Sequence, residues 1–293
     1  MTTPTGRTTQ AGRRTLRERL GPALGSAARW LVMLVVAVVI IVPIVYAFLG
    51  GFRTTGAIRK DPVALPDPWM VSNYTDILES DLFWNSLRNS LIVSVFTVVI
   101  VVLVSALAAY ALARFRFPGR ETMFTIFALG LLFPAAAAIL PLYVLLRSVG
   151  LLNNPMGVAL PQAAFGIPLT IIILRPFFRA IPVELEDAAS IDGCSRFGFF
   201  WRVLLPLSRP ALATVGILAP VGSWNAFLLP LLILGGNDQW TLPLGVMNFT
   251  QQYSQDLALV LAFTSLSMVP ALLFYVVAER QLIGGLTSGA IKG

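Results

Sequence analysis

The chain has 293 residues, of which 57% are hydrophobic and only 12% are charged, and its formal net charge is +7. This balance excludes an ordinary water-soluble domain and indicates a membrane protein. The sequence has no histidine and one cysteine, Cys194, which excludes His-dependent catalysis, His-ligated metals, an internal disulfide and a thiolate cluster.

Residues 1–28 are rich in Thr, Gly and Arg and are expected to form a flexible cytoplasmic tail. Arg13 and Arg14 precede an apolar run and could belong to a secretion signal. However, the run from Trp30 to Phe48 is longer than the apolar part of a signal peptide, and no convincing cleavage site follows it. A retained first membrane helix is therefore favoured.

Long uncharged intervals recur along the rest of the chain. A helix rises about 1.5 Å per residue, so about 20 apolar residues cross a hydrocarbon core of about 30 Å. The intervals that meet this length are 30–52, 89–113, 122–146, 148–174, 210–237 and 257–278. The sequence therefore predicts an all-α, polytopic membrane protein with six transmembrane helices.

The basic residues give the orientation of these spans. With a cytoplasmic N-terminus, most of the 21 Lys and Arg residues fall in the segments on the cytoplasmic side. The positive-inside rule selects this topology, with both termini cytoplasmic. The net charge is explained by this bias and by attraction to anionic membrane lipid, and nucleic-acid binding is not inferred from it.

The segments between the spans carry turn signals. The outside loop 53–84 contains three X-Pro pairs and is expected to be extended, and the turns expected at 114–120 and 153–155 are marked by Pro118-Gly119 and Asn153-Asn154-Pro155. A second outside loop, 235–256, is expected to pack at the membrane interface through Trp240, Phe249 and Tyr253.

The segment 181–210 is polar and patterned within an otherwise apolar chain. Pro182 suits the first turn of a short helix, and Glu184, Glu186 and Asp187 complement the positive end of its dipole. Asp192-Gly193 is expected to end this helix, with Gly193 at positive φ, and Ser195 to cap the next one. The pair Ala188-Ala189 provides a smooth face that another surface can approach, so this segment is expected to dock a partner.

The spacing of Glu186, Ala188, Ala189, Gly193, Leu205 and Pro206 resembles the EAA loop of ABC importer permeases. Two further stretches, Trp224–Phe227 with Pro230 and Thr241–Gly245, together with the end 285–293, resemble carbohydrate permeases of the MalG type. The resemblance covers about residues 30–293 and departs at Cys194, where the family usually has Ala. It implies a type I ABC importer permease domain at 29–284, which contains the EAA loop 181–210, and a cytoplasmic tail at 285–293.

The resemblance also implies partners and roles. The partners would be a second, MalF-like permease, an ATPase dimer that receives the coupling residues, and an extracytoplasmic sugar-binding protein. Neither of the two lysines, Lys60 and Lys292, ends a G-x-x-x-x-G-K-[ST] motif, so ATP and Mg²⁺ belong to the ATPase and this chain is not itself an enzyme. The coupling residues are Glu186, Ala188, Ala189, Asp192, Gly193, Leu205 and Pro206. Glu186 is expected to meet a basic residue of the ATPase, and the tail residues Thr287, Ser288, Gly289 and Lys292 are expected to enter the ATPase interface.

Candidate sugar contacts are the amides at or near membrane depth, since buried amides need hydrogen-bond partners: Asn225, Asn89, Gln162 and Asn248. Neighbouring helices can satisfy the same groups. A secondary transporter or channel without an ATPase remains an alternative function, although ion coupling would require charged residues within the spans and the six intervals contain none. An intramembrane enzyme is disfavoured because His and intramembrane Asp pairs are absent.

Overall fold

The computed structural model describes residues 16–250 and 256–290, with side chains described over 28–250 and 256–279. Four helices in these ranges are long and apolar enough to cross a membrane. They are α1 (Leu16–Gly50), α4 (Asp81–Arg114), α7 (Pro155–Ala180) and α14 (Leu257–Ala290). The prediction of an all-α membrane protein is confirmed.

The two remaining predicted spans are broken. Helices α5 (Arg120–Gly130) and α6 (Ala135–Ser148) meet at 96°, and Pro134 stands immediately before α6. Residues Arg196–Leu207, which comprise α9 (Arg196–Phe199), the π-helical turn η1 (Phe200–Leu204) and α10 (Leu205–Leu207), meet α11 (Arg209–Trp224) at 81°. The interval 122–146 is therefore not one straight helix. Within the interval 210–237, helix α11 ends at Trp224, and the chain continues into the short α12 (Leu228–Ile233).

Helices occupy parts of four other segments that the sequence analysis treated as loops or tails. The loop 53–84 is extended only in part: it contains α2 (Thr55–Lys60), α3 (Ser72–Glu79) and the first turn of α4. Helix α1 begins at Leu16, inside the segment expected to be a flexible tail, and α14 continues to Ala290, into the expected C-terminal tail. The loop 235–256 holds α13 (Leu242–Gly245) and the 3₁₀ turn η2 (Val246–Phe249); Trp240 and Phe249 pack against buried clusters, and Tyr253 lies outside the described residues.

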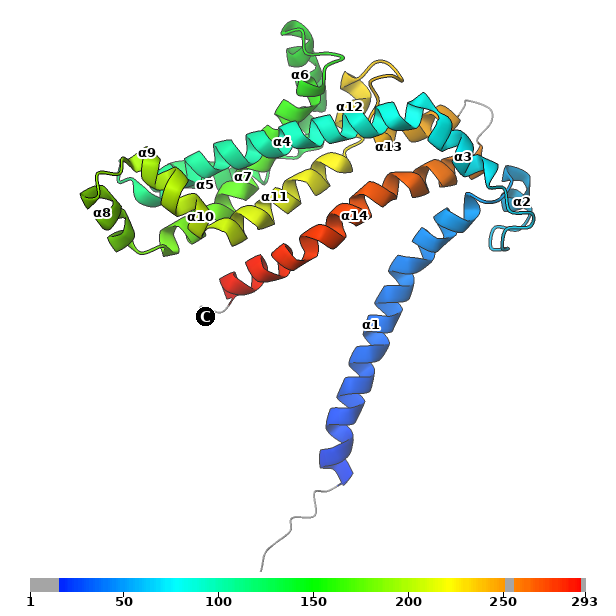
Figure 1. The fold of residues 1–293 in the computed structure, drawn as a ribbon, viewed down its shortest axis with the longest axis horizontal. Coiled ribbons are helices and arrows are strands. Elements are labelled where there is room, and N and C mark those ends of the chain that lie inside the picture. The colour runs from blue at the N-terminus through cyan, green and yellow to red at the C-terminus, as the bar shows by residue number, and fades with distance from the viewer. Residues whose placement is uncertain (1–15, 251–255, 291–293) are drawn as a thin grey trace, which may run out of the picture.

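The centre of the molecule is the pair α4 and α7, which run side by side (Figure 1). The buried face of α4 carries several small and hydroxyl side chains: Ser86, Ser90, Ser94, Thr97, Ser105 and Ala109. Small residues allow close approach of membrane helices, and at Gly166 of α7 an added Cβ would lie 3.0 Å from a methyl carbon of Val101. This packing brings polar side chains of α4 and α7 together inside the bundle.

The two ends of the bundle carry different elements. Helices α8 (Val183–Ile191), α9 and α10 lie at one end of the long axis, and α2, α3 and α13 lie at the other, while α1 diverges from the bundle (Figure 1). One buried cluster, which includes Tyr110, Leu174, Phe199 and Phe200, holds the α8–α10 end. Two further clusters hold the opposite end, around Val93 and around Phe263.

Candidate coupling loop and translocation cavity

The 181–210 segment forms the two short helices expected from its sequence. Pro182 occupies the N-cap position of α8, one residue before its first turn, and Glu184 and Glu186 lie in that turn. Ser195 caps α9 by accepting a hydrogen bond of 3.1 Å from the backbone N–H of Gly198. Acidic groups at one helix start and a hydroxyl cap at the next explain why the chain folds locally this way.

The end of α8 is a Schellman motif built around Gly193. Gly193 has φ of 79°, and its N–H donates to the carbonyl of Ser190 at 3.1 Å. The next residue, Cys194, donates its N–H to the carbonyl of Ala189 at 2.8 Å. This pair of bonds requires a left-handed residue at the turn, so the predicted role of Gly193 as a helix-ending glycine is confirmed.

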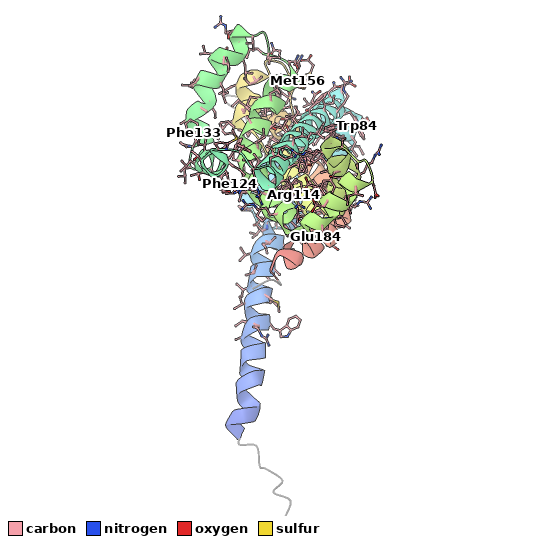
Figure 2. The ribbon with its side chains drawn as sticks, turned by 90° about the vertical axis from the view of Figure 1, so that its left-hand side faces the viewer. Trp84, Arg114, Phe124, Phe133, Met156 and Glu184 are labelled. Carbon is pink, nitrogen blue, oxygen red and sulfur yellow. The ribbon has the colours of Figure 1, made fainter. Side chains whose placement is uncertain are left out.

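The segment is fastened to the end of α4 by hydrogen bonds to its backbone. Arg114 donates from Nη2 to the carbonyl of Ile181 at 2.7 Å, and the Tyr110 hydroxyl donates to the carbonyl of Arg196 at 3.0 Å. Phe199 and Phe200 are buried in the same cluster as Tyr110. The two short helices are therefore a fixed extension of the helical bundle, and Figure 2 labels Arg114 of α4 and Glu184 of α8 in the view of this end.

The predicted coupling residues of α8 divide between two faces. Glu186 turns inward, where its Oε2 lies 3.8 Å from Nε of Arg114 and its side chain is 18% exposed. Ala189 packs with Cys194 against the buried cluster, whereas Ala188 and Asp192 are exposed. The prediction of a smooth Ala188-Ala189 face is therefore wrong for Ala189, because α8 turns that residue toward its own bundle. Glu186 has an ionic partner within its own chain, which the sequence did not reveal.

Large apolar side chains cover the outward surface of this segment. Ile191 is 87% exposed and Phe197 is 64% exposed, and Val183 and Leu185 are exposed beside them. Exposed apolar groups rimmed by charges are typical of a protein interaction site. The outer face of this segment therefore carries exposed apolar side chains in addition to the exposed Ala188.

Leu205 and Pro206 lie where the chain turns from the 181–210 segment into α11. Leu205 is half-buried against the Tyr110 cluster, and Pro206 is exposed in the first turn of α10. The N–H of Leu205 bonds back to the carbonyl of Phe200, closing the π-type turn that precedes the proline. Pro206 and Pro210 each remove a backbone donor, which accounts for the bend of 81° between the two helices.

A charged cluster next to this segment was missed by the sequence analysis. Glu121 of α5 accepts from Arg175 and Arg179 of α7, the latter at 2.9 Å, and pairs with Arg120 at 3.0 Å. Arg175 also donates to the carbonyl of Leu112 at 3.1 Å, and its guanidinium carbon lies 4.0 Å from the centre of the Phe124 ring. The four-residue spacing of Arg175 and Arg179 places both on one helix face, and this spacing is the sequence feature from which the cluster could have been predicted.

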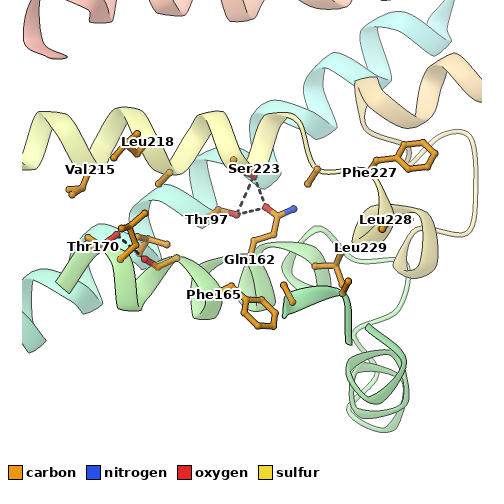
Figure 3. A pocket seen from close by; sticks show the side chains of 18 of the residues that line it. Thr97, Gln162, Phe165, Thr170, Val215, Leu218, Ser223, Phe227, Leu228 and Leu229 are labelled. Atoms are coloured by element: carbon orange, nitrogen blue, oxygen red, sulfur yellow. Dashed lines mark hydrogen bonds between the residues drawn. The ribbon is translucent and has the colours of Figure 1, made fainter. Parts of the chain in front are cut away.

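A cavity of about 570 Å³ lies between α4, α6, α7 and α11. Its walls are mostly apolar, and Phe165, Leu218, Phe227, Leu228 and Leu229 are among the side chains that line it (Figure 3). The polar side chains in its wall are Thr97, Gln162, Thr170 and Ser223. A concave, mostly apolar space with a few polar groups is typical of a small-molecule site.

Of the four predicted amides, only Gln162 lines this cavity. The Nδ2 atom of Asn89 donates to the carbonyls of Asp238 at 2.9 Å and Trp240 at 3.1 Å, which fastens the 235–256 loop to α4. Asn225 caps the end of α11 and donates to the carbonyl of Val221 at 2.9 Å, and Asn248 accepts from Asn237 at 3.2 Å. Neighbouring groups of the chain thus satisfy three of the four amides.

The remaining predicted site residues lie in the C-terminal segment. Thr287, Ser288 and Gly289 fall within the backbone of α14, and Lys292 lies outside the described residues. No group of three or more Asp, Glu or Cys side chains that could hold a metal ion occurs in the described ranges.

The comparisons with known proteins agree with this architecture. Residues 101–281 match the family described as binding-protein-dependent transport system inner membrane component. The diacetylchitobiose uptake system permease protein NgcG of Streptomyces coelicolor is 37% identical over 258 residues, which cover 87% of this chain and 85% of that protein. The trehalose transport system permease protein SugB of Mycobacterium tuberculosis is 35% identical over 255 residues, which cover 86% and 93%.

The fold also resembles that of a solved importer. A chain in the crystal structure of a bacterial ABC transporter that imports the acidic polysaccharide alginate superposes with a TM-score of 0.78 at 25% identity. The superposition covers 92% of this chain and 99% of that one. This agreement, together with the match over residues 101–281, shows that the chain belongs to the binding-protein-dependent ABC importer permease family.

Proposed function

We propose that this chain forms half of the translocation pathway of an ATP-driven sugar importer and couples it to an ATPase through the 181–210 segment. The observation that carries the proposal is the outward apolar surface of α8 and α9, held rigidly on the end of α4. A rigid projection transmits displacement of a bound partner to the spans more directly than a loose loop does.

The cargo is proposed to be a di- or oligosaccharide. Relatives named for diacetylchitobiose, trehalose and arabinooligosaccharides are 34–37% identical to this chain over most of its length. The cavity of about 570 Å³ is large enough for a disaccharide, and its apolar wall with a few polar groups is typical of a small-molecule site. Gln162 is the candidate contact there; Asn225 and Asn248 lie outside its wall, and Asn89 has the structural role described above.

The partners follow from the same assignment. They are a second, MalF-like permease, two ATPase subunits that hold ATP and Mg²⁺, and an extracytoplasmic sugar-binding protein. A second solved structure, of an alginate ABC transporter with a pentasaccharide-bound periplasmic protein, has the same fold with a TM-score of 0.67. Both termini of this chain are proposed to be cytoplasmic, because most of its basic residues then lie inside.

The proposal is tested by reconstituting the complex in proteoliposomes with diacetylchitobiose, trehalose and arabinobiose as cargo. Uptake of at least one sugar is expected to require ATP, the ATPase and the binding protein. Uptake driven by an ion gradient without the ATPase would instead support the secondary-transporter alternative.

The C-terminal residues Thr287, Ser288, Gly289 and Lys292 are proposed to contact the ATPase, as their resemblance to MalG-type permeases implies. Deletion of residues 286–293 should lower sugar-stimulated ATP hydrolysis by the purified complex while membrane insertion is unchanged. Intact hydrolysis and uptake by the truncated complex would remove this role.

A further inference from the structure

The cavity between α4, α6, α7 and α11 contains a hydrogen-bonded triad of Thr97, Gln162 and Ser223. Ser223 Oγ lies 2.6 Å from Gln162 Oε1, and Thr97 Oγ1 lies 3.1 Å from the same oxygen. Each hydroxyl comes from a different helix, α4 or α11, and both meet the amide of α7 (Figure 3). The triad joins three helices at one point in the cavity wall.

In the structure, the Gln162 amide turns its oxygen toward the two hydroxyls of the triad. The amide oxygen can only accept hydrogen bonds and the amide nitrogen can only donate them. Because two hydroxyls donate to Oε1, the oxygen faces α4 and α11 and the nitrogen points away from them (Figure 3). Nε2 is buried and has no acceptor in the described part of the chain.

The other polar side chains in the cavity wall already donate their hydrogens within the chain. Thr170 donates its hydroxyl hydrogen to the carbonyl of Gly166 at 2.9 Å, within its own helix. The Ser223 and Thr97 hydrogens are used on Gln162. Among the polar side chains that line the cavity, Gln162 therefore holds a donor without a partner in the described part of the chain, and such a buried donor is satisfied when a ligand or water supplies an acceptor.

We propose that Nε2 of Gln162 donates a hydrogen bond to a hydroxyl or ring oxygen of the saccharide as it passes through this cavity. The inference rests on the proposed function, since it requires a sugar in the pathway. The apolar wall beside Gln162, which includes Phe165 and Leu229, accepts the C–H faces of a sugar ring. No residue that lines the cavity is charged, so a neutral sugar meets no uncompensated charge there.

Ser223 has a positioning role in this arrangement. It donates the shorter of the two hydrogen bonds to Oε1 and so holds the amide in its orientation. Removal of this hydroxyl leaves the donor in place but frees the amide to rotate. Ser223→Ala is therefore expected to lower uptake less than loss of Gln162 itself.

The test uses the full complex in proteoliposomes, with diacetylchitobiose, trehalose and arabinobiose delivered by the loaded binding protein. Gln162→Met, which keeps the length of the side chain but lacks the donor, should lower the initial uptake rate by about three- to tenfold. The matched control is Thr170→Val, which changes a hydroxyl in the same cavity that is already bonded to its own helix. It should transport like the wild type and keep the wild-type thermal unfolding midpoint and basal ATP hydrolysis, and uptake by each variant is expressed per assembled complex.

A second readout separates sugar recognition from a structural role. Monodeoxy analogues of the fastest cargo are compared in the wild type and in Gln162→Met. In the wild type, one analogue should be taken up more slowly than the parent sugar, by about the factor that Gln162→Met causes. In Gln162→Met, the same analogue should be taken up as fast as the parent sugar, because the hydrogen bond is already absent there. A merely structural Gln162 would leave every analogue equally affected in both proteins.

The outcomes distinguish the two proposals. If the wild-type complex transports none of the sugars, the proposed function fails. If it transports one of them and Gln162→Met matches the wild type, or equals Thr170→Val, the proposed function stands and the role of Gln162 is overturned.

Discussion

The two ends of the α4–α7 pair are held by different chemistry. At the end that carries the 181–210 segment, guanidinium groups make the connections: Arg114 bonds the carbonyl of Ile181, and Arg175 joins Glu121 to the carbonyl of Leu112. At the opposite end, neutral groups join the 235–256 loop to α4, since Asn89 and Ser90 hold its backbone. The buried guanidinium of Arg53 at that end bonds backbone carbonyls of its own segment, at residues 57–62.

The charge of a polar group depends on how deep it lies in a bilayer. Arginine side chains at span ends reach the interface or water, whereas an ion deep in hydrocarbon is costly. The cavity triad follows the same rule, because Thr97, Gln162 and Ser223 are uncharged. The ionic end is suited to contact a water-soluble partner, and the neutral interior is suited to pass an uncharged solute.

The largest expected loss of sugar uptake follows substitution of Gly193, at the end that carries the 181–210 segment. Gly193→Val places a β-branched residue at φ of 79°, which costs about 2 kcal/mol and opposes the Schellman bonds that end α8. Sugar uptake is expected to fall by more than about tenfold while the chain still inserts. Gly193→Asp should abolish transport because it adds a charge beside Asp192, and not through backbone strain, since aspartate tolerates the left-handed conformation.

The control at this position is Gly193→Asn, because asparagine tolerates the left-handed conformation. An added Cβ would meet no atom within 4 Å, so the strain arises from the backbone and not from a clash. Gly193→Asn should keep most of the uptake. Wild-type uptake by Gly193→Val at equal expression would contradict this account.

A smaller effect is expected at the neutral end. Asn89→Leu removes the hydrogen bonds to Asp238 and Trp240 and leaves both carbonyls without this donor, at a cost of about 2 kcal/mol. Thermal unfolding of the detergent-solubilised chain should shift downward, and hydrogen exchange around residue 240 should accelerate. The matched control is Asn225→Leu, whose exposed amide bonds only its own helix and should cost under about 0.5 kcal/mol. Equal shifts from the two variants would show that Asn89 does not fasten this loop.

The sequence predicted the features that depend on local pattern. The uncharged intervals located the spans, and the start of α8, its end at Gly193 and the cap at Ser195 all follow from neighbouring residue types. The sequence did not predict the helix breaks at Pro134 and Pro206. Proline occurs in many of the spans, and packing decides which of these prolines bends its helix.

The features that the sequence did not predict depend on contacts between distant residues. The inward face of Glu186 is set by Arg114, which lies more than seventy residues earlier. The different roles of Gln162 and Asn89 also depend on tertiary contacts. Both are amides in apolar helices, and they differ in the groups that the fold places beside them. Local composition finds a buried amide, but not whether the fold supplies its acceptor.

The smallest expected effect concerns the pair of Arg114 and Glu186. Glu186→Lys places a second cation beside Arg114, so it should weaken recovery of the ATPase even if Glu186 never contacts the ATPase. A charge exchange, Arg114→Glu with Glu186→Arg, separates the two explanations. If the internal pair matters, the exchange should recover part of the loss, within about 1 kcal/mol, because the charged atoms lie 3.8 Å apart. The recovery should be partial because Arg114→Glu also removes the donor to Ile181.

Co-purified ATPase and the unfolding midpoint are measured for both single variants and the double variant. If the double variant recovers no more ATPase than the sum of the single losses predicts, Glu186 acts on the ATPase directly, as the sequence alone suggested.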